Sequence, residues 1–227
     1  MTVVDDRRAH TTVHQRSATR TQARDAPSNI DALTSDAHVA ADEYRTAMRQ
    51  VPAAVAVVTT TTPGGRQGLT VTAVSSVSAD PPQVLVCINR ETRSAEAISA
   101  AGRFGVNYLA YEHEELAGAF ATPTDNHENR FRLARWVDSP GGTPLLQDAL
   151  LAFDCTVVNE IHSGTHTIFI GQVTDIRDHD GRPLLYQRGA FTTTEPVSTT
   201  EGRPGMDPNR PGPTFWVGLL KSRTTGC

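Results

Sequence analysis

The sequence has few cysteines and no long apolar run. Cys87, Cys155 and Cys227 are the three cysteines among 227 residues, an odd number at spacings that match neither a disulfide framework nor a zinc motif. No apolar run approaches the roughly 20 residues that a membrane span needs, so we expect no membrane segment. The lack of a disulfide pattern favours a reducing compartment, and we expect a cytoplasmic protein.

A strong charge of either sign is also missing. Lys and Arg number 21 and Asp and Glu number 25, which gives a formal net charge of −4. A nucleic-acid binder needs a basic face, so we expect no nucleic-acid partner. The length suits one domain with additional segments better than two domains.

Several catalytic motifs are absent. No Gly-x-Gly-x-x-Gly follows a strand pattern, which argues against a Rossmann dinucleotide site, and there is no Walker loop, nucleophile-elbow serine or His-Glu-x-x-His. His162 and His166 would lie about 13 Å apart on one straight strand. A turn at Ser163-Gly164 could bring them closer, but Cys155 is the only nearby candidate for a third ligand. We therefore expect no metal site.

The two ends of the chain differ from its middle. Residues 1 to about 38 are rich in Arg, Thr, Asp, Ser and Ala and show neither a helical nor an alternating apolar pattern, so they cannot bury enough surface to offset chain entropy. Residues 197–213 carry several prolines among Gly, Thr and Asn, which is typical of a linker. We expect a disordered N-terminal tail over 1–40, a folded domain over 41–196 and a Pro/Gly-rich C-terminal tail over 197–227.

One apolar segment interrupts the C-terminal tail. It reads Thr214-Phe215-Trp216-Val217-Gly218-Leu219-Leu220. It is either part of a disordered end or a docking peptide that packs on its own domain or on a partner.

Between the tails, β patterns predominate. Helical spacing occurs at 42–50, 94–101 and 112–121, with one helical turn or two at 130–136, and Ser94 is the expected N-cap of the second helix. The β-rich stretches are 54–62, 68–77, 83–89, 104–110, 149–161, 165–178 and 183–186. The near-continuous apolar run at 83–89 predicts a strand buried on both faces. Six or seven short strands with a few helices predict a mainly β domain whose antiparallel sheet closes or half-closes into a barrel.

Hydroxyl side chains gather in one of these stretches. Between Gly68 and Pro81 lie Thr70, Thr72, Ser75, Ser76 and Ser78. They suit the solvent face of an edge strand, because threonine has a high β propensity. They also suit a surface where small side chains admit a flat ligand and hydroxyls bond to its ring carbonyls or phosphate oxygens. Composition alone slightly favours the edge-strand interpretation.

The order of the sequence blocks resembles a known family. The blocks are Val51–Thr60, Gly68–Pro82, Val84–Arg90 with Ser94, Phe104–Ala110, Gly164–Val173 and Pro183–Phe191. Over about residues 43–195 they resemble the short-chain flavin reductases, the reductase components of two-component flavin-dependent monooxygenases. The resemblance implies an FMN-binding split β-barrel, a Greek-key-like antiparallel barrel with a few short helices.

The resemblance also implies site residues. The segment from Thr70 to Ser76 would line the isoalloxazine ring, and the residues from Cys87 to Ser94 would approach the ribityl chain and the phosphate, where helix-start amides favour an anion. His166, in the place of the histidine in the Gly-Asp-His motif of the family, would lie beside the nicotinamide as the catalytic residue. The implied cofactor-binding residues are Thr70, Val71, Thr72, Ala73, Ser75, Ser76, Cys87, Asn89, Arg90, Ser94, Arg130 and Phe131.

Plainer interpretations stand beside these roles. His166 could be an ordinary hydrogen-bonded histidine of a barrel, Cys87 a small core residue, and Arg130 a solvated surface arginine.

Two positions depart from the family pattern: Thr165 replaces the aspartate of Gly-Asp-His, and Phe191 stands where a tyrosine is common.

The implied function is an NAD(P)H:flavin oxidoreductase that transfers hydride to FMN or FAD. It would act as a homodimer and supply reduced flavin to a separate monooxygenase. In such chemistry the cofactors carry the reaction, which agrees with the missing catalytic constellation. A split-barrel flavoenzyme that oxidises an organic substrate directly, or a non-catalytic flavin-binding module, is the alternative. The choices between FMN and FAD, and between NADH and NADPH, stay open.

Overall fold

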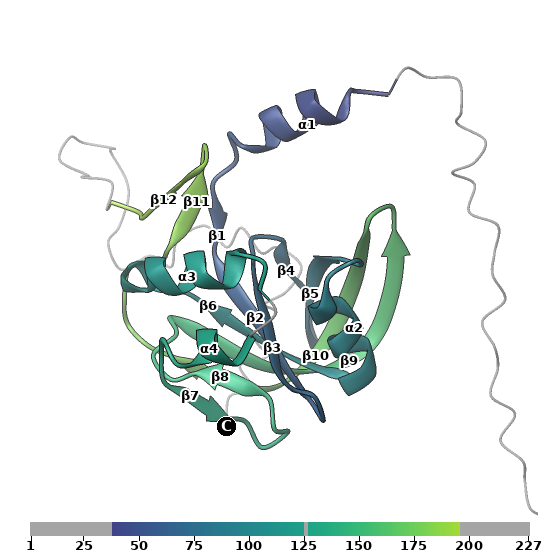
Figure 1. Ribbon diagram of the computed structural model, residues 1–227, viewed down its shortest axis with the longest axis vertical. Helices are drawn as coiled ribbons and strands as arrows, with labels where there is room; N and C mark the ends of the chain where they lie inside the picture. Colours follow the sequence, from purple (N-terminus) through teal and green to yellow (C-terminus); the bar gives the residue numbers. More distant parts are fainter. Residues whose placement is uncertain (1–37, 125–126, 196–227) are drawn as a thin grey trace, which may run out of the picture. The chain divides into compact units, whose positions relative to one another are not determined.

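The computed structural model describes residues 38–124 and 127–195. The two predicted tails therefore lie outside the described residues, apart from 38–40, and so does the apolar segment 214–220. Within 41–195 the chain is mainly β, as predicted. Figure 1 shows the strands wrapped into a curved sheet with short helices against it.

The elements follow the predicted order with shifted ends. The helices are α1 (Ala41–Met48), α2 (Arg93–Ala101), the 3-10 turn η1 (Tyr111–His113), α3 (Glu114–Ala121) and α4 (His127–Phe131). The strands are β1 (Ala53–Ala54), β2 (Ala56–Thr62), β3 (Gly65–Val71), β4 (Val74–Ala79), β5 (Pro82–Asn89), β6 (Arg103–Tyr108), β7 (Trp136–Asp138), β8 (Pro144–Leu146), β9 (Leu151–Ser163), β10 (His166–Asp178), β11 (Leu185–Gln187) and β12 (Ala190–Thr192).

Seven strands form the main sheet. Their order is β3-β2-β6-β9-β10-β5-β4, and every pair is antiparallel. The edge strands β3 and β4 are consecutive in the chain and are joined only by Thr72 and Ala73. So short a link reaches about 10 Å at most, so the sheet must curl until its two edges meet at one corner without pairing. This geometry confirms the predicted split barrel.

The corner at Thr72-Ala73 divides the single strand predicted over 68–77. Residues on both sides have high β propensity, so local sequence does not show the break. The chain turns there because it passes from edge strand β3 to edge strand β4. The carbonyl of Ala73 accepts the amide hydrogen of Cys87 at 3.0 Å, which fixes the corner against β5.

The barrel core lies on one face of β5 and β10. Val84, Val86 and Ile88 of β5 pack there with Phe169 of β10 and Phe104 of β6. The alternate residues of β5 remain half-buried or exposed. The prediction that this strand is buried on both faces is therefore wrong for the single chain. A second apolar cluster, on the other side of β2 and β6, contains the rings of Phe120 and Phe131 beneath α3 and α4.

Helix α2 begins at a different cap from the predicted one. Thr92, in an extended conformation, accepts the amide hydrogen of Ala95 on its side-chain oxygen at 3.2 Å, so Thr92 and not Ser94 is the N-cap. Ser94 lies in the first turn and is 3 % exposed. The helix ends at Gly102, whose φ of 64° suits glycine and whose amide donates to the carbonyl of Ile98 at 2.8 Å.

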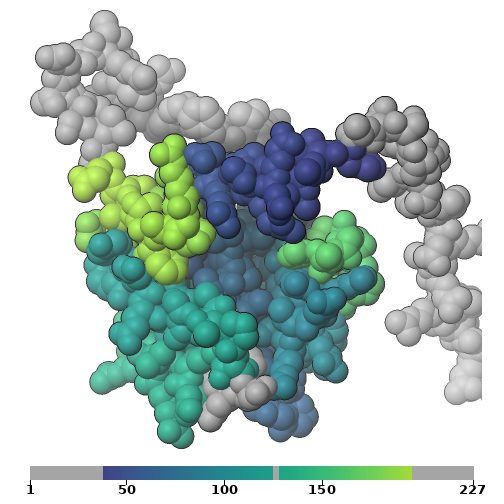
Figure 2. Space-filling model, turned by 45° about the horizontal axis from the view of Figure 1, so that its top comes forward, coloured from purple at the N-terminus to yellow at the C-terminus, as the bar shows by residue number. Residues whose placement is uncertain are grey.

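Two long strands cross the middle of the sheet. Strands β9 and β10 form a hairpin with register shifts at Ile170/Gly171 and Val173/Asp175, and Figure 1 shows it as a long, curved ribbon. The last strand, predicted at 183–186, corresponds to β11, which forms a small separate sheet in the order β1-β11-β12. In Figure 2 the surface is hollowed between the yellow-green β11–β12 segment and the green hairpin.

Candidate functional site

The strands β9, β10, β5 and β4 present a second face, which we call the outer face because it points away from the core. On β5 this face carries Leu85, Cys87 and Asn89, which alternate with the core residues. The antiparallel register sets Cys87 opposite Ile168 and Asn89 opposite His166. Directly opposed side chains have Cβ atoms about 5 Å apart, so the outer face brings Cys87, Asn89 and His166 together.

The outer face has an apolar middle and a polar end. Ile161 of β9 lies opposite Ile168, which lies opposite Cys87, so one apolar row crosses three strands. Ile168 and Cys87 are half-buried and Ile161 is 43 % exposed. Burial raises the pKa of the Cys87 thiol. Asn89 and His166 form the polar end of this platform.

The turn after β5 connects the outer face with helix α2. The carbonyl of Asn89 accepts hydrogen bonds from the amide and the hydroxyl of Thr92, at 3.1 and 2.8 Å. The side-chain oxygen of Asn89 accepts the amide hydrogen of Glu91 at 3.0 Å, and Arg90 donates its amide hydrogen to the carbonyl of Thr165 at 3.1 Å. The start of α2 is thereby fixed to the same end of β5 and β10 that carries His166.

Each histidine of the β9–β10 hairpin has a threonine partner. His166 Nδ1 lies 2.9 Å from the hydroxyl of Thr165, and His162 Nδ1 lies 3.1 Å from the hydroxyl of Thr167. His162 is paired across the hairpin with Thr167, so it projects from the face opposite to that of His166. In the described part of the chain, no three His, Cys, Asp or Glu side chains gather as metal ligands would.

A pocket of about 510 Å³ opens at the start of α2, and we call it the anion pocket. Thr92 and Ser94 line it from the helix, Thr70 from β3, and Arg130 from α4. The first amides of a helix have no partner within it and attract an anion. The Arg130 side chain adds a positive charge, and its guanidinium donates to the carbonyl of Thr122.

Arg130 is a buried cation. The residue is 7 % exposed, and its guanidinium carbon lies 5.7 Å from the centre of the Phe120 ring. Burial lowers the pKa of Arg130, but an arginine stays protonated in proteins. A positive charge held in a pocket wall suits an anionic ligand, so the solvated-surface interpretation of Arg130 does not hold.

An ion pair anchors the helix that carries Arg130. Arg66 of β3 pairs with Glu128 of α4, and the hydrogen bond from Arg66 lowers the pKa of the Glu128 carboxyl. The Arg66 guanidinium also stacks over the Phe131 ring at 4.7 Å. These contacts hold α4 against β3 at the edge of the anion pocket.

The structure separates the other predicted site residues. Val71 lies in the barrel core, and Phe131 is 2 % exposed and packs 4.9 Å from the Trp136 ring. A ligand can meet Val71 only through its backbone, and the Phe131 ring faces other aromatic side chains. The hydroxyl of Thr70 already donates to the carbonyl of Ala117 at 2.7 Å. Thr72, Ala73 and Arg90 are partly or fully exposed at turns.

The two serines of β4 point in opposite directions. Ser75 is opposite Leu85 and shares the outer face, whereas Ser76 is opposite Val84 and faces inward. Strand alternation requires this separation. Only Ser75 of the pair can therefore meet a ligand that lies on the outer face with Cys87.

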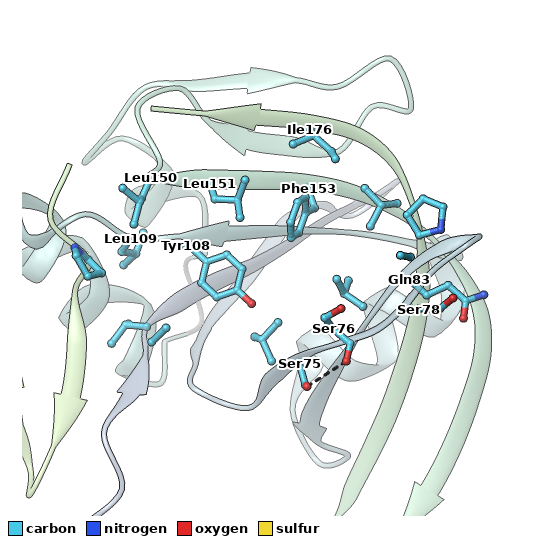
Figure 3. A pocket seen from close by; sticks show the side chains of 18 of the residues that line it. Ser75, Ser76, Ser78, Gln83, Tyr108, Leu109, Leu150, Leu151, Phe153 and Ile176 are labelled. Carbon is cyan, nitrogen blue, oxygen red and sulfur yellow. Dashed lines mark hydrogen bonds between the residues drawn. The ribbon is translucent and has the colours of Figure 1, made fainter. Parts of the chain in front are cut away.

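Sequence reasoning missed a second cavity, the barrel-mouth pocket, of about 670 Å³. Figure 3 shows Ser75, Ser76 and Ser78 along one wall, with Tyr108, Phe153 and Ile176 among the residues on the other walls. Six strands contribute to it, and no local sequence pattern signals that their side chains meet. The sequence shows only an apolar residue between charged ones, such as Ile176 between Asp175 and Arg177.

No helix of the described ranges is long and apolar enough to cross a membrane.

Residues 48–195 match the model of the flavin reductase-like domain family. The NADH-dependent FMN reductase RutF of Ancylobacter novellus is 40% identical over 168 residues, which cover 72% of this chain and 92% of that protein.

Solved structures agree with this family match. Nitrilotriacetate monooxygenase component B homolog from Mycobacterium thermoresistibile aligns with a TM-score of 0.65 and 30% identity, over 71% of this chain and 90% of that chain. The NADH:FAD oxidoreductase SgcE6 of Streptomyces globisporus C-1027, solved with NAD and FAD fragments, aligns with a TM-score of 0.65 and 27% identity, over 69% of this chain and 94% of that chain.

Proposed function

Because the chain belongs to the flavin reductase-like domain family, we propose that it is an NAD(P)H-dependent flavin reductase that supplies reduced flavin to a separate monooxygenase. One observation in the structure carries the proposal. A half-buried platform around Cys87 ends beside both His166 and the anion pocket at the start of α2. A flavin needs the same two features, a surface for its ring and a site for its phosphate.

The residues fit a flavin with its phosphate in the anion pocket. The α2 amides, Ser94 and the buried Arg130 would bind the phosphate. From there the ribityl chain would pass Asn89, and the ring would lie on the outer face over Cys87 and near Ser75. The exposed corner at 72–73 leaves backbone groups available to the ring edge.

When bound, the flavin supplies the hydride-accepting atom, N5, for the hydride of a reduced nicotinamide. The protein then has to hold two rings face to face and to exclude water. The apolar row of Ile168 and Cys87 gives one ring a flat support. Hydrogen-bond donors at the corner would stabilise the negative charge that develops on the flavin ring.

His166 would orient the nicotinamide. It stands at the polar end of the platform, and the hydroxyl of Thr165 holds its Nδ1 at 2.9 Å. A threonine hydroxyl can act as donor or acceptor, so it fixes the ring without adding a charge. This is how Thr165 would replace the family aspartate.

Relatives guide the choice of cofactors. The similar protein of Ancylobacter novellus is an NADH-dependent FMN reductase, and the similar structure of Streptomyces globisporus was solved with NAD and FAD fragments. We propose NADH as the hydride donor and FMN as the first acceptor, with FAD also accepted. The phosphate contacts described above are common to both flavins.

A homodimer in the cytoplasm would complete the assembly. The half-exposed apolar row that includes Ile161 supports a second copy packing over the outer face and closing the flavin site. Cys87 and Cys155 are free thiols in the structure, which is compatible with a reducing compartment.

The test combines turnover with labelling. Purified protein should oxidise NADH only when FMN or FAD is added, and FMN should slow maleimide labelling of Cys87 in a Cys227→Ser variant. Cys155 is the internal control, because burial raises the pKa of its thiol to about 12 and it should stay unlabelled.

Each alternative predicts another outcome. NADH oxidation that needs a third, organic substrate would identify a direct oxygenase or oxidase. Bound flavin without any turnover would identify a binding module. Turnover with no protection of Cys87 would keep the reductase but move the flavin away from the outer face.

A further inference from the structure

Apart from Ser75, the residues that line the barrel-mouth pocket have no role in the flavin site proposed above. Its walls are mainly apolar, and they include Tyr108, Leu151 and Phe153. Ile176 stands at its rim and is 57 % exposed. Figure 3 shows these side chains facing the serine-bearing strand β4 across the cavity. An open apolar cavity of about 670 Å³ exposes a surface that proteins normally cover.

The sequence contains a matching segment. Phe215, Trp216, Val217, Leu219 and Leu220 form the single apolar run in residues 196–227, where prolines, glycines and polar residues otherwise predominate. Aromatic side chains bury 150–250 Å² each, roughly. Two or three side chains of this segment would fill a cavity of the observed size.

The chain leaves the described part close to the pocket. Leu184 lines the pocket, and the next residue, Leu185, pairs with Thr192 of β12. The described residues end at Glu195, three residues later. The route from the pocket rim to the start of the C-terminal segment is therefore short.

The intervening length is sufficient. About 20 residues separate Glu195 from Phe215, and that length of chain reaches roughly 65–70 Å when fully extended. A segment linked so closely to its site has an effective concentration on the order of millimolar. A weak apolar contact would therefore suffice for docking within one chain.

From these observations we propose that residues 214–220 dock in the barrel-mouth pocket of their own chain, with aromatic side chains inserted between β4 and the wall formed by Tyr108 and Phe153. The hydroxyls of Ser76 and Ser78 border the pocket and offer hydrogen-bond partners to the docked backbone. Docking would cover the inward face of β4 and leave the outer face free except beside Ser75, which also lines the pocket.

Tryptophan fluorescence gives a direct test on the full chain. The chain has two tryptophans, Trp136 and Trp216, and Trp136 packs against Phe120 and Phe131, away from the pocket. The spectrum of the wild type minus that of Trp216→Phe therefore reports Trp216. We expect a blue-shifted difference spectrum and acrylamide quenching several-fold weaker than that of N-acetyltryptophanamide.

Rim variants locate the site. Ile176→Glu puts a carboxylate at the mouth, and Ala79→Glu does so on the β4 side. Both residues are exposed, so the fold should persist, as circular dichroism and thermal melting can verify. Each should raise the quenching of Trp216 several-fold. Val137→Glu, at an exposed residue of β7 outside the pocket, is the matched control and should behave like the wild type.

Four results would overturn the proposal. The first is acrylamide quenching of Trp216 in the wild type that equals the quenching of N-acetyltryptophanamide. The second is a Trp216 that stays protected from acrylamide in both rim variants. The third is protection of Trp216 that is lost on dilution, because residues 214–220 would then dock in the pocket of another copy. Finally, rim variants that change the particle mass while Trp216 is exposed throughout would show that a second copy covers the mouth.

Discussion

At the residue scale, strand register and packing decide which of the candidate residues His166, Arg130 and Phe131 face a possible ligand. Asn89 and His166 share a face because a strand register sets them opposite each other, 77 positions apart in the chain. Arg130 and Phe131 are neighbours in sequence, yet Arg130 lines a pocket and Phe131 fills a core. Sequence motifs propose candidate residues, but packing decides which of their side chains can face a ligand.

Replacing His166 tests the nicotinamide position. His166→Ala should raise the KM for NADH several-fold while the Kd for FMN changes little, because His166 would contact only the nicotinamide. Steady-state kinetics and a flavin fluorescence titration measure the two quantities.

The matched control is His162→Ala. His162 has the same kind of threonine partner in the same hairpin but projects from the opposite face. It should leave both constants near those of the wild type. Equal increases in KM and Kd for His166→Ala would remove the assignment of His166 to the nicotinamide.

At the element scale, strands were predictable and their partners were not. Alternation and β-branched runs located most strands of the main sheet to within a few residues. The corner at Thr72-Ala73 was missed because residues on both sides favour strands. The anion pocket needs β3, α2 and α4 together, and no local pattern reports which elements meet.

Gly171 in β10 tests the packing between strand and core. A Cβ at this position would lie 2.5 Å from the Phe104 ring and 2.8 Å from Cys155 Cβ. Gly171→Ala should therefore lower the free energy of unfolding by about 1–3 kcal/mol, measured as a shift of the urea midpoint.

Gly118 of α3 gives the comparison. A Cβ there would meet nothing within 4 Å, so Gly118→Ala should raise the stability by up to about 1 kcal/mol through helix propensity. If Gly171→Ala also stabilised the protein, the tight contact with Phe104 would be refuted.

At the scale of the whole molecule, the outer face is the apolar surface that a single chain leaves half-exposed to solvent. The row of Ile161, Ile168 and Cys87 is too apolar for an ordinary solvent face. The near-continuous apolar run of β5 suggested burial on both sides, and a second copy would supply the missing half. If the proposed dimer forms over this face, β5 would be covered on both sides, as the sequence predicted.

Light scattering tests the assembly. The wild type should have twice the mass of one 24.5 kDa chain, and Ile161→Glu should produce monomers, because it places a charge in an apolar interface. The monomer should also bind FMN more weakly if the second copy closes the site. A monomeric wild type would contradict the dimer without affecting the barrel.

The central hairpin also has a consequence for how the chain folds. Strands β9 and β10 are joined by a turn at Gly164 and stand in the middle of the seven-strand order, with β6 on one side and β5 on the other. Their pairing closes a short loop, whereas β6 must reach β9 across some 45 residues, and short loops form faster. The links between β2 and β3 and between β4 and β5 are equally short, so we expect these three hairpins to form early and the pairing of β6 with β9 to form late. Substitutions within the hairpins should then slow folding, while those at the contact between β6 and β9 should mainly speed unfolding.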